Sequence, residues 1–374
     1  MSENKKKERV LSPLEQKIND WFNKYLVRIP FVQKMFFIEH LKTMIHAGLS
    51  LVEGLDVLSK EIENKKFKKI IGEIKFGVEK GKQLSEVFAE YPQAFPPIYV
   101  KMIEAGEIGG KLEESLAQVA TQMQKNYQLT STIRGAMIYP AVILFAMGGI
   151  GILMVTVVLP KLLEIFKEFD AELPLPTKIL MAITDFMSKP LNLVIVAIVL
   201  ALLIFTYITL LKKSLAFKRA VHTLNLNLPI IGTVVKKINL ARFSLTLSSL
   251  LKSTVPIINA TEITASTCSN LKYQEALKVT AEKLKAGIPL SEILADYDKL
   301  FPPMVTEMIM VGERTGEIDQ LLTELANFYG EEVDKTMKNF ATIIEPVIIL
   351  VLGVAVAGMA VAVIMPMYSL VQTM

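Results

Sequence analysis

The longest runs of apolar residues along the chain fall in three places. No charged residue occurs at positions 135–160, 190–211 or 346–374. Each run is long enough to cross the apolar core of a bilayer, which takes about 20 residues in a helix. One such run alone could be a buried core helix, but three of them predict a membrane protein with three spans.

Elsewhere, apolar positions recur at the three-to-four-residue spacing of amphipathic helices. Over residues 31–133 this pattern predicts about six short helices in a compact bundle, and no convincing strand pattern is present. The signals for helix boundaries are Ala47-Gly48, Gly81 and Gly106 at helix ends, and Ser50 with Glu53 and Pro96-Pro97 at helix starts. The fold class that follows is all-α.

The same helical unit occurs twice, at an offset of 206 positions. Phe95-Pro96-Pro97 recurs as Phe301-Pro302-Pro303, and Gly106-Glu107 recurs as Gly312-Glu313. The register holds without a gap from about Phe37 to Pro160, which indicates an internal duplication. We therefore expect two homologous six-helix bundles in addition to the three spans.

Gly106 and Gly312 are expected to end a helix in the left-handed conformation. Glu107 and Glu313 would then face the positive end of the following helix. At another turn, Gly48-Leu49-Ser50 becomes Thr254-Val255-Pro256 in the second copy, so this turn is expected to be rebuilt.

Residues 12–29, ahead of the first bundle, read as an amphipathic helix with a capping box at Ser12 and Glu15. Its apolar stripe is Leu14, Ile18, Trp21, Phe22, Tyr25 and Leu26. Packing on the first bundle, anchoring at a membrane surface and docking of a partner all remain open. The matching region at about 218–236 has a different pattern, broken by Asn225, Asn227 and Pro229, so the second bundle is expected to do without such a helix. This difference favours docking to a partner or the membrane over packing on the first bundle, with Trp21, Phe22 and Tyr25 as candidate contacts.

The distribution of lysine and arginine predicts the orientation in the membrane. Residues 1–137 hold 21 Lys/Arg and residues 212–340 hold 16, whereas residues 161–189 hold four beside five acids. This predicts a cytoplasmic N-terminus and an external C-terminus. The expected segments are a basic N-terminal segment with the amphipathic helix (1–30), cytoplasmic domain 1 (31–134), a first span (135–160), a short external loop (161–189), a second span (190–211), cytoplasmic domain 2 (212–342) and a third span (343–370).

Composition and motifs favour no catalytic, cofactor or metal site. The net charge of +4 is modest and gives no reason to expect nucleic acid as a partner, and the single cysteine, Cys268, excludes an internal disulfide. The segment Gly106 to Lys111 has too few residues between its glycines for a phosphate loop, and Leu112 replaces the Ser or Thr that would bind magnesium. His40, His46 and His222 are the only histidines, and none sits in a metal-binding or triad pattern.

The predicted spans contain several residues typical of membrane boundaries and helix packing. Tyr139-Pro140 and Glu345-Pro346 are expected to open the first and third spans, with Glu345 snorkelling at the interface. Gly148, Gly353 and Gly358 are candidates for close helix packing in lipid, although glycine is also common in membrane helices without that role.

The duplicated Phe-Pro-Pro…Gly-Glu-x-x-Gly unit, joined to the Tyr139-Pro140 and Glu345-Pro346 spans, resembles a known family. It is similar to the PilC/GspF inner-membrane platform proteins of type IV pilus and type II secretion machines, over residues 31 to 370. The order of domains and spans matches as well. The long lysine-rich start resembles the pilus branch slightly more.

The resemblance implies a non-enzymatic core of an assembly machine, and it carries over no catalytic residue. The implied partners are a hexameric assembly or retraction ATPase, pilin or pseudopilin subunits, other inner-membrane assembly components and the lipid bilayer. A homo-oligomer, dimer or higher, is expected, and Glu107, Glu313 and Arg314 are candidate contacts. The alternative function is a transporter or permease, because duplicated membrane proteins are often transporters. However, the repeat is mostly soluble and the spans lack polar groups at mid-membrane. An intramembrane enzyme would need an acid pair within the spans, and none is present.

Overall fold

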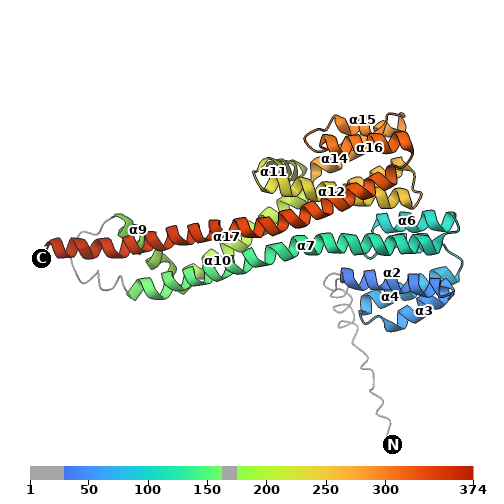
Figure 1. Cartoon of the computed structure of the whole chain (residues 1–374). Helices are drawn as coiled ribbons and strands as arrows, with labels where there is room; N and C mark the ends of the chain where they lie inside the picture. The colour runs from blue at the N-terminus through green and yellow to red at the C-terminus, as the bar shows by residue number, and fades with distance from the viewer. Residues whose placement is uncertain (1–28, 162–174, 374) are drawn as a thin grey trace, which may run out of the picture. The chain divides into compact units, whose positions relative to one another are not determined.

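The computed structural model describes residues 29–161 and 175–373, and these residues fold as helices joined by short turns (Figure 1). No β-strand occurs within those two ranges. The predicted helix 12–29, with Trp21, Phe22 and Tyr25, lies outside the described residues. The helices of the first repeat are α2 (Phe31–His46), α3 (Leu51–Glu61), α4 (Lys65–Glu79), α5 (Leu84–Ala89), α6 (Pro97–Ile108) and α7 (Leu112–Leu153).

The second repeat has the same six helices in the same order, which confirms the predicted pair of six-helix bundles. They are α12 (Ile231–Lys252), α13 (Ile257–Thr267), α14 (Leu271–Lys285), α15 (Leu290–Ala295), α16 (Pro303–Thr315) and α17 (Ile318–Thr373). The Ser50–Glu53 capping box at the start of α3 is confirmed. The chain divides into two compact units: one holds the first bundle with residues 242–268 and 274–327, and the other holds the remainder.

An aromatic cluster fills the core of the first bundle. The Phe88 and Phe95 rings stack with centroids 3.8 Å apart, and Phe37 meets Phe67 edge-to-face at 5.5 Å. The 206-residue offset places Phe243, Tyr273, Leu294 and Phe301 at the same four positions of the second repeat, and all eight side chains are buried. Each bundle therefore has its own apolar core, built at matching positions.

The turn after the first helix has the same backbone conformation in both repeats, so the prediction of a rebuilt turn is wrong. Gly48 has φ +88° and Thr254 has φ +60°. The amide of Gly48 donates to the Ile45 carbonyl, and the amide of Thr254 donates to the equivalent Leu251 carbonyl, both at 2.9 Å. Because these bonds close the end of the first helix, a β-branched threonine is held in a conformation that favours glycine.

Gly106 and Gly312 do not end their helices, and the expectation of a left-handed conformation there is wrong. They lie inside α6 and α16, and the left-handed glycines are Gly110 (φ +67°) and Gly316 (φ +80°). The reason for glycine is close approach of the next helix. A Cβ on Gly106 would lie 2.3 Å from the Ser115 Cβ, and one on Gly312 would lie 2.7 Å from the Ile318 Cα.

Three helices are long and apolar enough to cross a membrane, as predicted: Leu112–Lys161, Pro190–Lys213 and Ile318–Val361. The first and third continue from the bundles without a break, so Pro140 and Pro346 lie inside helices that begin well before them. Proline removes one backbone donor, and membrane helices tolerate this loss where neighbouring groups satisfy the freed carbonyl. The first continues into a π-helix, η1 (Met154–Val158), before the predicted loop, and within the part of that loop that is described lies α9 (Leu175–Met187).

A helix also precedes the second bundle, where the sequence pattern predicted none. It is α11 (Leu215–Asn227), which follows α10 (Pro190–Lys213). Asn225 and Asn227 are accommodated, and the chain leaves the helical conformation only at Leu228, because the residue before a proline is biased to extended backbone. The Leu271 amide donates to His222 Nδ1 at 2.8 Å, which joins α11 to the start of α14. The argument that the second bundle does without such a helix is therefore wrong.

The strained turn at Thr254 gives a first testable prediction. Replacing Thr254 with glycine removes strain of about 1–3 kcal/mol, from which the extra flexibility of glycine in the unfolded chain subtracts about 0.5–1 kcal/mol. We expect Thr254→Gly to raise the free energy of unfolding by about 1 kcal/mol, measured by denaturation of the detergent-solubilised protein. The reciprocal control, Gly48→Thr, should lower it by a similar amount, and a neutral pair of variants would contradict the strain at φ +60°.

Close packing at Gly106 gives a second prediction. A methyl group there must push α6 away from α7, and overpacking of this kind costs about 1–3 kcal/mol. Gly106→Ala should therefore lower the melting temperature. The control is Gly72→Ala in α4, where an added Cβ meets nothing within 4 Å, and it should raise stability slightly because alanine favours helix. Equal behaviour of the two variants would show that Gly106 is not a close contact.

Candidate functional site

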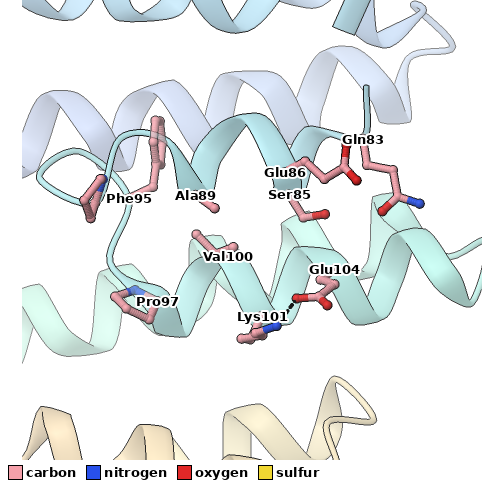
Figure 2. A pocket seen from close by; sticks show the side chains of 10 residues that line it. Gln83, Ser85, Glu86, Ala89, Phe95, Pro97, Val100, Lys101 and Glu104 are labelled. Carbon is pink, nitrogen blue, oxygen red and sulfur yellow. Dashed lines mark ion pairs between the residues drawn. The ribbon is translucent and has the colours of Figure 1, made fainter. Parts of the chain in front are cut away.

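Each bundle has a groove between its short fourth helix and the helix that follows. In the first bundle the groove has a volume of about 370 Å³ and lies between α5 and α6 (Figure 2). Ala89 and Val100 contribute apolar surface, and Glu86, Lys101 and Glu104 contribute charge. Lys101 and Glu104 form an ion pair at 2.5 Å along α6.

The equivalent groove of the second bundle lies between α15 and α16, with a volume of about 650 Å³. Ser291, Glu292 and Ala295 occupy the positions of Ser85, Glu86 and Ala89, at the same offset of 206. The α16 side differs, because Glu307 and Met310 stand where the first groove has Lys101 and Glu104. The α5 side of the groove is thus kept in both copies, whereas the α16 side differs and the second groove has the larger volume.

A half-buried glutamate joins the two helices that form each groove. The Glu107 carboxylate accepts hydrogen bonds from the amides of Leu84 (2.6 Å) and Ser85 (3.0 Å) and from the Ser85 hydroxyl. Glu313 does the same for Leu290 (2.5 Å), Ser291 (3.2 Å) and the Ser291 hydroxyl. The prediction that these carboxylates face a helix N-terminus holds, but the helix is the preceding α5 or α15 and not the following one.

These hydrogen bonds cap the start of the short helix and explain how it is stable. A six-residue helix has no stability of its own, and its first amides lack partners within the helix. A carboxylate that bonds two of these amides satisfies them and also favours the positive end of the helix. Because the carboxylate belongs to α6 or α16, it fixes the spacing of the two helices that form the groove. Glu107 and Glu313 are therefore occupied within the bundle.

The remaining predicted contact and boundary residues are placed as follows. Arg314 is exposed and lines the second groove. Tyr139 is exposed next to the buried Pro140, and Glu345 and Pro346 are exposed on α17. An added Cβ at Gly148, Gly353 or Gly358 would meet nothing within 4 Å, so these glycines leave open helix surface. No other described residue packs closely against them.

A polar contact between the two repeats was missed by the sequence reading. On α7, the side-chain oxygen Oε1 of Gln122 accepts from the Ser249 hydroxyl at 2.6 Å, and Oε1 of Gln118 accepts from the Ser253 hydroxyl. Gln118 also donates to the Lys252 carbonyl at 3.3 Å. The available signal was a pair of glutamines four residues apart among the buried Val119, Ala120 and Met123 of the helix.

A cavity of about 310 Å³ adjoins this contact, lined by Tyr99, Gln122 and Asn126 on one side and Arg242, Thr246 and Thr267 on the other. Burial lowers the pKa of the Arg242 guanidinium, and its Nε has no hydrogen-bond partner. Burial also raises the pKa of the Cys268 thiol to about 12, against the opposing effect of Arg242. The thiol is therefore protonated and unreactive at neutral pH. Among the described residues, no group of His, Cys, Asp or Glu is arranged to hold a metal ion.

Comparison with known proteins places this architecture in a family. The family model described as "Type II secretion system (T2SS), protein F" matches twice, at residues 37–160 and 243–366. The chain belongs to this family. The two matches are separated by 206 positions, so they confirm the duplication and its register.

Relatives over nearly the full length carry two kinds of name. The type IV pilus assembly protein PilC of Thermus thermophilus is 34% identical over 358 residues, which cover 93% of this chain and 86% of the relative. PilC of Pseudomonas aeruginosa is 33% identical, over 89% of this chain and 88% of the relative. The type II secretion system protein F of Pseudomonas aeruginosa is 29% identical, over 89% and 81%. The resemblance proposed from the duplicated motif is confirmed.

The cap of the short helix gives a third prediction. Glu107→Ala leaves two amides of α5 without a partner, and the loss of hydrogen bonds to a charged group costs about 1.5–3 kcal/mol. The variant should therefore melt earlier, and Glu313→Ala should destabilise the second bundle likewise. The matched control is Glu104→Ala, one turn away on α6, which breaks only an exposed ion pair and should cost less than about 0.5 kcal/mol. Equal melting of Glu107→Ala and Glu104→Ala would refute the cap.

Proposed function

We propose that this protein is an inner-membrane platform of a type IV pilus or type II secretion machine. It couples a hexameric cytoplasmic motor ATPase to the insertion or extraction of pilin-like subunits, and it acts as a homo-oligomer without catalysing a reaction itself. The observation that carries the proposal is the duplicated bundle attached to apolar spans, together with relatives named for both machines over about nine-tenths of the chain. A permease has no comparable support.

The proposed orientation places both bundles in the cytoplasm and the C-terminus outside. Its support is the excess of lysine and arginine in residues 1–137 and 212–340. A reporter that is active only outside the cytoplasm should be active when fused after Met374 and silent after Lys213. The reverse pattern would overturn the orientation.

The two grooves are the proposed contacts for the other components of the machine. Both are partly apolar and carry more acidic than basic side chains; Glu292 and Glu307 give the second groove two exposed carboxylates, with Arg314 as its exposed cation. A groove of this kind fits a segment with basic residues beside apolar ones. Because the family resemblance implies a motor ATPase as the cytoplasmic partner, we assign this segment to the motor ATPase.

Reversal of charge in the second groove tests this assignment. We expect Glu292→Lys combined with Glu307→Lys to lower co-purification of the motor ATPase, and with it surface filaments or secreted protein, at least ten-fold. The amount of protein in the membrane should not change, since both side chains are exposed. The matched control is Glu262→Lys with Glu282→Lys, two exposed acids of the same bundle outside the groove. Normal assembly with the groove variant would reject the groove as the contact.

A further inference from the structure

The contact between the repeats uses different faces of the two copies. The glutamine face of the first repeat, Gln118 and Gln122 on α7, meets the serine face of the second, Ser249 on α12 and Ser253 directly after it. The contact is therefore heterologous, because each repeat contributes a surface that the other does not. Within one chain this contact forms once. The positions of the second repeat that match the glutamine face, and those of the first repeat that match the serine face, are left unused.

The two unused faces follow from the 206-residue offset. Glu324 and Phe328 on α17 correspond to Gln118 and Gln122. Thr43 on α2 and Ala47, the C-cap of α2, correspond to Ser249 and Ser253. Where Gln122 is 3% exposed in the contact, Phe328 is 42% exposed. Thr43, Ala47 and Glu324 are exposed as well. A large apolar side chain exposed where its duplicate is a buried amide is the reverse of the usual preference.

We propose that the Glu324/Phe328 face of one copy docks on the Thr43/Ala47 face of a second copy, in the manner of the contact inside the chain. This inference deepens the proposed homo-oligomer by naming its interface. The occupant is a second copy because the same pair of helix faces already meets once within the chain. By analogy with the contact inside the chain, Phe328 would lie against Thr43 as Gln122 lies against Ser249.

The unused faces are apolar where the paired faces are polar. Inside the chain, the Gln118 side chain donates to the Lys252 backbone carbonyl and accepts from the Ser253 hydroxyl. Glu324 has no such donor and Ala47 has no hydroxyl, so these two hydrogen bonds are not repeated between chains. Phe36, at the position of Arg242, is 53% exposed and extends the apolar surface of α2. The polar pairing inside the chain is thus replaced by an aromatic contact between chains. A heterologous contact repeats from copy to copy and closes as a ring if the rotation allows it.

Cross-linking of the full-length protein in membranes tests the interface. In a Cys268→Ala background, one copy carries Phe328→Cys and a differently tagged copy carries Thr43→Cys. A short thiol cross-linker should join the two tags, and either variant alone should give at least ten-fold less dimer. The control is Gln122→Cys with Ser249→Cys in one chain, which should cross-link within the chain. Absence of the mixed dimer while this control reacts would overturn the proposal, as would equal dimer from Phe328→Cys alone.

A second variant separates this interface from the oligomer itself. Phe328→Glu should lower co-purification of two tagged copies at least ten-fold, whereas its helicity and melting temperature should stay unchanged because the side chain is exposed. If the copies still co-purify, the homo-oligomer stands and this interface is wrong. If the variant instead loses only the motor ATPase, the face belongs to that partner and the proposal fails.

Discussion

The bond between one glutamate and the start of a six-residue helix determines the surface of each bundle. Glu107 and Glu313 reach back from α6 and α16 to the first amides of α5 and α15. Without that carboxylate, helices so short have no means of satisfying their own termini. The grooves lie between these same helices, so their width and lining depend on the cap. The glutamates therefore set the position of the groove walls at which we propose that a partner binds.

Duplication supplied two copies of one architecture, and the differences between them show where the copies have diverged. The cores match position by position, from Phe37 and Phe243 to Phe95 and Phe301. The surfaces do not match: Lys101 becomes Glu307 in the groove, and Gln122 becomes Phe328 on the last helix. Packing constrains an apolar core in the same way in both copies, whereas a surface is constrained only by what it contacts. The divergence of the surfaces is consistent with separate partners for the two repeats.

The helices that end the bundles are the same helices that carry the apolar runs. Leu112–Leu153 includes the buried Val119 and Met123 of the first bundle as well as the uncharged stretch that begins at residue 135. In the second repeat, Ile318–Thr373 likewise contains both a bundle segment and an apolar segment. A continuous helix joins these parts more stiffly than a flexible loop would, which suits a protein proposed to pass the action of a motor to subunits in the membrane.

The sequence by itself determined the class of structure, because periodicity, length and repetition are local properties. The three uncharged runs, the Ser50–Glu53 capping box, the proline starts and the 206-residue register could all be found without coordinates. Only the tertiary structure decided why particular residues are needed. Gly106 reads as a helix end until Ser115 is placed against it, and Thr254 reads as a new turn until its hydrogen bonds are compared with those of Gly48. The partners of Glu107, Gln118 and Gln122 lie 22 to 135 positions away along the chain. Contacts over such separations depend on how the helices pack, and no local pattern records that.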